Sequence, residues 1–120
     1  MGGEPDSDFE VEVATHLRAR GYEVEMQVGV LSFRIDLGIR HPDHLDRFLA
    51  GVECDGVAFH SSKSARDRDR LREAILNGLG WDLVRIWSTD WYDDPELETD
   101  KVVKRLGELR RRPPPDVAGR

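Results

Sequence analysis

A chain of 120 residues is long enough for one domain with a single hydrophobic core. Its composition, 38% hydrophobic and 35% charged, is typical of a compact globular domain and argues against a disordered or membrane-spanning chain. The net charge of −6 counts against a uniformly basic nucleic-acid-binding protein. Because MGGEPDSD has neither the basic start nor the apolar stretch of a signal peptide, we expect a cytoplasmic protein with no membrane partner.

The first half of the chain predicts one helix and three strands. The helix is capped by Asp6 or Ser7 and ends at Gly21. Weak alternation over residues 22–28 predicts a strand, and residues 41–47, HPDHLDR, are turn-like. Two further strands are expected over FRIDLGI (33–39) and LAGVECD (49–55), and the apolar face of the former holds Phe33, Ile35, Leu37 and Ile39.

The second half predicts a helix, a strand and a final helix. The helix begins near Ser64, ends around Gly80, and carries an apolar stripe of Leu71, Ala74, Ile75 and Gly78. LVRIW, residues 83–87, is the fourth strand, and Pro95 opens a helix that runs to about residue 111. We expect one domain over residues 6–112, followed by a disordered tail at 113–120. Three successive strands and a helical crossover to a fourth favour an α/β or α+β fold with helices packed on the sheet.

Acidic residues stand at the end of the third predicted strand, where a core favours apolar side chains. Glu53 and Asp55 are two positions apart and therefore point to the same face. Asp36 lies inside the preceding apolar strand, where aspartate is disfavoured. If these strands are neighbours, three carboxylates meet, and their repulsion and desolvation favour a hard divalent cation. The pattern predicts a Mg²⁺ or Mn²⁺ site that leaves coordination positions for phosphate oxygens.

Blander interpretations of these residues stay open. Asp36 has Arg34 two positions away on the same face, which is typical of a salt-bridged strand residue. His60 follows the turn at Gly56 and is expected to reach the carboxylates as a general acid or base. Cys54 is expected to be a small core residue, because its acidic neighbours do not favour a thiolate.

The second predicted helix is a candidate for phosphate contact. Arg66 and Arg70 share a face one turn apart, opposite the apolar stripe. The alternative is an exposed face of ion pairs with acidic neighbours on the same helix. Three aromatic residues in and after the fourth predicted strand also have two interpretations, stacking on bases or packing in the core: Trp87, Trp91 and Tyr92.

The order of several short motifs resembles a known family. ID (35–36), ECDG (53–56), FHSS (59–62), ARDRDR (65–70) and RIWSTDW (85–91) follow one another as in the restriction-endonuclease-like domain of the PD-(D/E)XK superfamily, in the branch similar to very-short-patch-repair endonucleases. The resemblance covers almost the whole chain. It implies an αβββαβ core with a mixed sheet flanked by helices. It also implies Mg²⁺-dependent hydrolysis of DNA in repair, restriction or DNA processing, often beside helicase-like modules.

Position by position, the resemblance implies a set of site residues. Asp36 matches the metal-binding aspartate, and Glu53 matches the acid of the (D/E)xK element. Asp55 stands where the superfamily usually has lysine, a departure shared by the repair branch, which has a histidine where His60 falls. The resemblance also makes the backbone carbonyl of Cys54 an additional metal ligand. From the first helix it draws Glu10 as a further acid. Phosphate contacts are predicted from Lys63, Arg66 and Arg70, and Lys63 is also a candidate to replace the missing lysine.

Three functions are open at this point. The first is a metal-dependent DNA endonuclease. The second is a noncatalytic DNA-binding or targeting module that keeps the fold after losing the lysine. The third is a structural domain of a larger machine. The negative net charge indicates that partner domains would supply much of the DNA affinity in either of the first two cases.

Overall fold

The computed structural model describes residues 8–56 and 63–112, the side chains of 63–66 excepted. The predicted order of helix, three strands, helix, strand and final helix is confirmed, and a short helix, α3, is added before the last one. In chain order the elements are α1 (Asp8–Ala19), β1 (Val24–Val30), β2 (Phe33–His41), β3 (His44–Asp55), α2 (Lys63–Gly78), β4 (Leu83–Trp87), α3 (Ser88–Asp93) and α4 (Pro95–Arg111).

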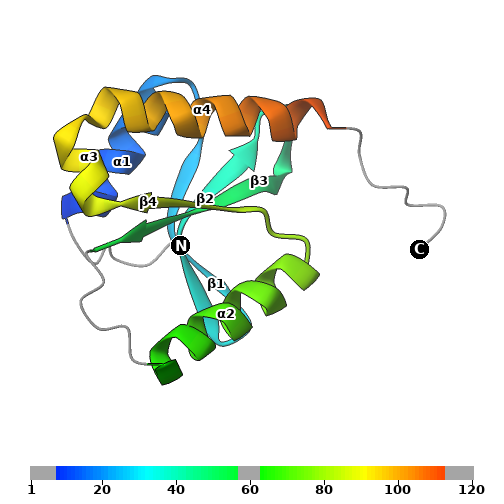
Figure 1. The fold of residues 1–120 in the computed structure, drawn as a ribbon. Coiled ribbons are helices and arrows are strands. Elements are labelled where there is room, and N and C mark those ends of the chain that lie inside the picture. Colours follow the sequence, from blue (N-terminus) through cyan, green and yellow to red (C-terminus); the bar gives the residue numbers. More distant parts are fainter. Residues whose placement is uncertain (1–7, 57–62, 113–120) are drawn as a thin grey trace.

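The four strands form one mixed sheet in the order β1-β2-β3-β4. The first three strands are antiparallel, and β4 runs parallel to β3. Helices α1, α3 and α4 cover one face of the sheet, while α2 lies on the other (Figure 1). The expected α+β fold, a mixed sheet flanked by helices, is confirmed. Because β3 and β4 are parallel, both end at the same edge, on the left of Figure 1.

The main core lies between the sheet and the layer of α1, α3 and α4. From the sheet come Leu37, Ile39, Val52 and Ile86, all at most 1% exposed. The helices contribute Phe9, Val13, Leu17, Trp91, Val102, Leu106 and Leu109. Trp91 is fully buried, so the core interpretation holds for this residue, but it is wrong for Trp87, which is 38% exposed. In the described part of the chain, no helix is long and apolar enough to cross a membrane.

The β2–β3 hairpin is longer than the sequence predicts. Its turn occupies Pro42 and Asp43, and pairing resumes at once between His41 and His44. The turn-like appearance of HPDHLDR arises because this end of the hairpin is largely exposed, so that polar side chains need not alternate with apolar ones. The register shifts near Arg40, which marks an irregularity in the ladder.

Helix α2 is oriented differently from the prediction. The expected apolar stripe is wrong as a buried face, since Leu71 is 62% exposed and Ala74 and Gly78 are exposed. Leu76, outside that stripe, is fully buried. The helix also turns Arg72 toward the sheet, where it pairs with Glu53. This ion pair contributes to the orientation of α2, and hydrophobic periodicity cannot predict it.

Two glycines lie opposite each other where the sheet faces α2. Gly38 on β2 pairs with Gly51 on β3. A Cβ atom at Gly38 would lie 2.7 Å from both Phe48 Cε1 and Val28 Cγ2. The ring of Phe48 packs on that of Trp81 at a centroid distance of 5.0 Å. Side chains of the strands and the α2–β4 loop therefore cover this part of the sheet, and the missing side chains at the two glycines make room for them.

The substitution Gly38→Ala tests this close packing. We expect it to reduce the free energy of unfolding by about 1–3 kcal/mol, because the methyl group must displace packed side chains. Gly29→Ala on β1 is the matched control, since no atom lies within 4 Å of its Cβ position, and a change within about 0.5 kcal/mol is expected. Urea unfolding of both variants measures the difference; equal effects would contradict the packing described.

Candidate active site

Asp36 and Glu53 meet where the pairing of β2 with β3 ends. The last paired residues are Leu37 and Val52. Beyond them, Asp36 Oδ2 accepts a 2.8 Å hydrogen bond from the backbone N–H of Cys54, and the N–H of Asp36 lies 3.4 Å from Glu53 Oε2. A side-chain carboxylate thus replaces the next backbone acceptor of the ladder. The structure brings these two predicted acids together from adjacent strands.

A buried glutamate and a glutamine extend this pair toward α1. Glu10 is 4% exposed and Gln27, on β1, is 6% exposed. Gln27 Nε2 donates to Glu10 Oε1 at 2.7 Å and lies 3.4 Å from Asp36 Oδ1. The carboxyl groups of Glu10 and Asp36 are thus bridged by one amide. Glu10 is therefore the acid of α1 that lies beside Asp36. Glu12 instead accepts hydrogen bonds from Trp91 and Tyr92.

Gln27 is the residue of this group that the sequence did not reveal. Its φ of 51° lies in the left-handed region, which is uncommon for a residue with a side chain. Such a conformation costs roughly 1 kcal/mol or more and persists where the surroundings fix it. The available signal was a polar residue between Met26 and Val28 in a weakly alternating strand, which does not by itself indicate a site.

The electrostatic consequence is greatest at Asp36. Burial raises its pKa from 3.8 to about 6, the hydrogen bond from Cys54 opposes that rise, and the negative charges of Glu10 and Glu53 add to it. Asp36 therefore exchanges a proton in the mildly acidic range. The same surroundings raise the pKa of the Cys54 thiol far above its usual range, mainly by burial. Cys54 packs against the core, as expected for a small core residue.

Two arginines hold the acids at the end of β3. Arg72 of α2 contacts Glu53 Oε1 through Nη1 and donates through Nη2 to the backbone oxygen of Arg34 at 2.5 Å. Arg85 Nε of β4 lies 2.6 Å from Asp55 Oδ2. Neither carboxylate oxygen has the angular geometry of a hydrogen bond in these ion pairs. Burial raises the pKa of Asp55, and the charge of Arg85 opposes the rise.

The predicted convergence of three carboxylates is therefore not formed. Asp55 points to Arg85 on the α2 side and does not join Asp36. Among the residues that the structure describes, no three Asp, Glu, His or Cys side chains are arranged to hold a metal ion. The donor chemistry of Asp36, Glu53 and the Cys54 carbonyl suits Mg²⁺ or Mn²⁺, but the geometry does not provide a ready-made cage while Arg72 contacts Glu53.

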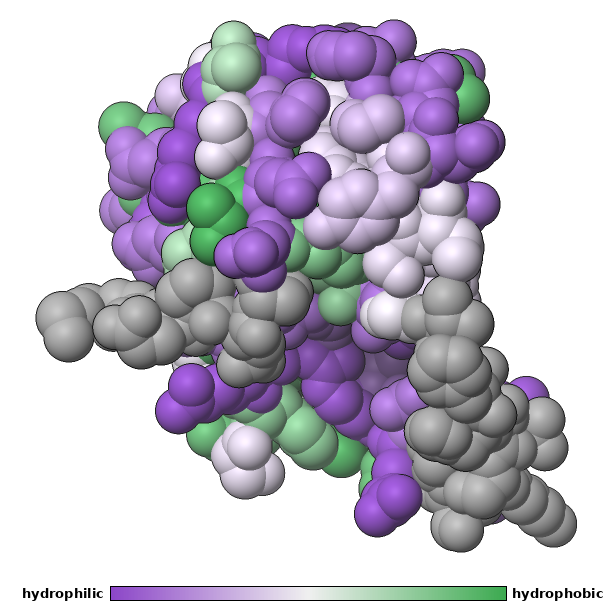
Figure 2. Space-filling model, turned by 90° about the vertical axis from the view of Figure 1, so that its left-hand side faces the viewer, coloured by the Kyte–Doolittle hydropathy of each residue, from purple (hydrophilic) through white to green (hydrophobic). Residues whose placement is uncertain are grey.

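The remaining predicted residues lie outside this group or outside the described residues. His60 falls in the latter class, as do the side chains of Lys63 and Arg66. Arg70 is exposed on α2. A cavity of about 170 Å³ adjoins the site and is lined by Glu53, Glu73, Leu83 and Arg85. Seen from the edge where β3 and β4 end, the molecule is hollowed, and hydrophilic residues line the hollow (Figure 2).

A comparison with known families identifies the family of the chain. The model of the restriction-endonuclease-like family REase_MTES_1575 matches residues 9–106. The chain therefore belongs to that family. No curated protein matches the chain. Family membership indicates a nuclease-type function with DNA as the substrate.

The raised pKa of Asp36 gives a pH-dependent stability. The folded chain retains this proton between about pH 4 and 6 while the unfolded chain releases it, so ionisation of Asp36 lowers the stability of the fold as the pH rises through that window. Without added metal, in EDTA, Asp36→Asn should raise the free energy of unfolding by about 1–2 kcal/mol at pH 8, a value reduced for solvent screening of a half-buried group, and by little at pH 4.

Asp46→Asn provides the control for that measurement. Asp46 lies on β3 like Glu53, but it is exposed, so its substitution should change stability little at either pH. Urea unfolding at the two pH values gives the comparison. An Asp36→Asn variant that is destabilised equally at pH 4 and pH 8 would contradict the electrostatic account.

Proposed function

We propose that this chain is a Mg²⁺-dependent DNA endonuclease whose centre is the pair Asp36 and Glu53. The observation that carries the proposal is their contact at the end of the β2–β3 ladder. The bridge from Gln27 to Glu10 supports it, because buried carboxylates beside one another are costly unless a cation or a proton compensates them. Mn²⁺ is the alternative cation. A role in DNA repair or restriction, and a helicase-like partner, belong to the same proposal.

Each residue of the proposed centre has a separate role. Asp36, Glu53 and the carbonyl of Cys54 would hold the cation, which when bound stabilises negative charge on the phosphate and lowers the pKa of water. The amide of Gln27 fixes the position of the Asp36 carboxylate. The N–H of Cys54 does the same from β3. His60 remains the candidate for proton transfer to or from the reacting oxygens.

Arg72 is central to the proposed metal-free state. Its guanidinium contacts the 5%-exposed carboxylate of Glu53, so it compensates a charge that is expensive to bury. Cation binding at Glu53 requires Arg72 to leave. The released guanidinium would stay within reach of a bound phosphate, in a chain whose position 55 carries no lysine. We propose that Arg72 supplies the positive charge for which Lys63 was a candidate.

A noncatalytic DNA-binding module is the second candidate. The observation that favours it is the pairing of both acids of β3 with arginines, Glu53 with Arg72 and Asp55 with Arg85. If these pairs are permanent, the site cannot take up a cation. Contact with DNA would then depend on exposed basic residues such as Arg70 on α2, as well as on Lys63 and Arg66.

A cleavage assay separates the two candidates. With supercoiled and single-stranded DNA, we expect nicking or cutting in Mg²⁺ or Mn²⁺ and none in EDTA. Asp36→Asn and Glu53→Gln should each reduce the rate about a hundredfold or more, because each removes a charge that acts at the reacting phosphate. Asp46→Asn should cut normally. DNA binding without cleavage in either metal would favour the noncatalytic module, and cleavage that survives both substitutions would exclude the proposed centre.

Metal affinity tests the role of Arg72 without relying on turnover. We expect Arg72→Gln to bind Mn²⁺ at least about fivefold more tightly than the wild type, because the nearly buried Glu53 carboxylate is then uncompensated until a cation binds. Arg68→Gln, an exposed arginine of the same helix, should leave the affinity unchanged. Isothermal titration calorimetry measures both. Weaker Mn²⁺ binding by Arg72→Gln would show that the guanidinium supports the metal site and does not compete with it.

A further inference from the structure

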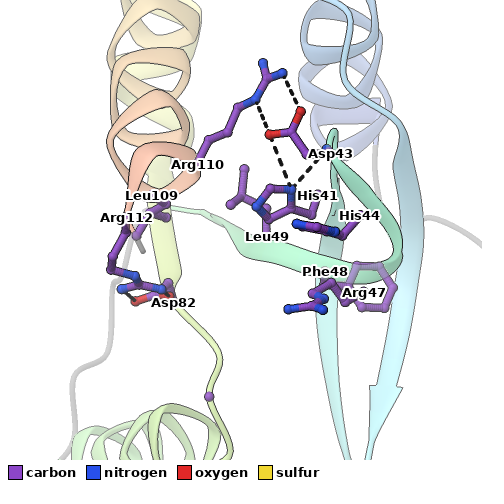
Figure 3. A pocket seen from close by; sticks show the side chains of 11 residues that line it. His41, Asp43, His44, Arg47, Phe48, Leu49, Asp82, Leu109, Arg110 and Arg112 are labelled. Atoms are coloured by element: carbon purple, nitrogen blue, oxygen red, sulfur yellow. Dashed lines mark hydrogen bonds and ion pairs between the residues drawn. The ribbon is translucent and has the colours of Figure 1, made fainter. Parts of the chain in front are cut away.

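A second polar pocket lies at the opposite end of the sheet from Asp36 and Glu53. It has a volume of about 280 Å³ and opens between the β2–β3 hairpin and the C-terminal end of α4 (Figure 3). Five of its lining residues are basic or can become so: His41, His44, Arg47, Arg110 and Arg112. His41 lies five positions along strand β2 from Asp36, so the two places are about 17 Å apart.

Two of the arginines are already paired and form the walls of the pocket. Arg110 donates through Nε and Nη2 to the two oxygens of Asp43, each at 2.9 Å. Arg112 donates to Asp82 through Nη2 at 2.7 Å and through Nη1 at 3.4 Å. The first pair joins α4 to the hairpin, and the second joins the end of α4 to the loop before β4. These pairs fix the shape of the pocket, and their charges largely cancel.

The remaining basic groups are less closely paired: His41 Nδ1 lies 4.0 Å from Asp43 Oδ2, an ion pair only when the ring is protonated. Arg47 is exposed and has no hydrogen bond or ion pair within the described parts of the chain. The rings of His41 and His44 lie 4.9 Å apart. The N–H of Asp43 donates to His41 Nδ1 at 3.1 Å, which leaves the proton of the neutral ring on Nε2 as a donor. The pocket thus holds more positive charge and more donors than its two carboxylates neutralise.

Burial and the neighbouring charges both act on the pKa of His41. Burial lowers its pKa, and the positive groups His44, Arg47 and Arg110 lower it further, while Asp43 opposes them. A bound anion would act in the opposite direction. Phe48, which lines the pocket, packs against Trp81 and against the guanidinium of Arg40, which lies 4.0 Å from the ring centroid.

We propose that this pocket binds a phosphate group through Arg47, His41 and His44, with the walls formed by Arg110 and Arg112. A tetrahedral oxyanion accepts several converging N–H donors, and such charge-assisted contacts are stronger than neutral ones. The volume suits a phosphate carried on a sugar or a small organic group, and it is smaller than most drug-sized sites. The inference rests on the pocket alone and holds whether or not Asp36 and Glu53 cleave DNA.

The test is a titration of the whole chain in EDTA, followed by NMR of the histidine rings and the backbone amides. Inorganic phosphate is compared with chloride at equal ionic strength. We expect phosphate to shift the resonances of His41, His44 and Arg47 in a saturable manner and to raise the pKa of His41. Shifts no larger than those in chloride, or saturable shifts centred on Asp36 and Glu53, would overturn the proposal.

Variants and oligonucleotides complete the experiment. His44→Gln combined with Arg47→Gln should weaken phosphate binding about tenfold, since two charge-assisted contacts are lost, whereas Arg68→Gln should not. Thermal unfolding verifies that the double variant is folded, and unchanged phosphate affinity in that folded variant would also overturn the proposal. Oligonucleotides with and without a 5′-phosphate then identify the source: binding of only the phosphorylated strand indicates a terminal phosphate, and equal binding indicates the backbone.

Discussion

The hydrogen bond from the Cys54 N–H to the Asp36 carboxylate is the interaction on which the site depends. Two antiparallel strands normally continue to pair through backbone groups. Here the ladder ends at Leu37 and Val52, and a side chain accepts the next donor. Asp36 is thereby held next to Glu53, at the point where β2 and β3 cease to pair. The parallel partner β4 continues beside β3 to Asp55, so the end of β3 remains supported where β2 departs.

Charge compensation explains the arrangement around that junction. Glu10, Asp36 and Glu53 are close enough for the first and third to raise the pKa of the second. Gln27 contributes neutral donors on one side, while Arg72 contributes a full positive charge on the other. Because one member of the group must hold a proton or face a cation, the proposed function would have a metal ion replace the charge of Arg72. The same need explains why α2 turns Arg72 toward the sheet.

Much of the fold could be predicted from the sequence, and less of the site. Apolar periodicity, Gly21 and Pro95 located the helices and strands, because these signals are local. The register between β2 and β3, which places Asp36 beside Glu53, is not local, and neither is the pairing of Arg85 with Asp55. Gln27 escaped notice because its role depends on an unusual backbone angle and a partner 17 residues away. The sequence predicts the wrong face of α2, because burial of Leu76 and the ion pair of Arg72 with Glu53 orient the helix, and the predicted stripe includes neither residue.

The central claim is that Asp36 and Glu53 together accept a divalent cation once Arg72 withdraws. A crystal structure of the chain grown with Mn²⁺, with anomalous diffraction recorded at the manganese edge, tests it most directly. The account predicts an anomalous peak in contact with both carboxylates and the Cys54 carbonyl oxygen, with the Arg72 guanidinium no longer on Glu53. A peak elsewhere, or an Arg72–Glu53 pair that persists at saturating Mn²⁺, would contradict it.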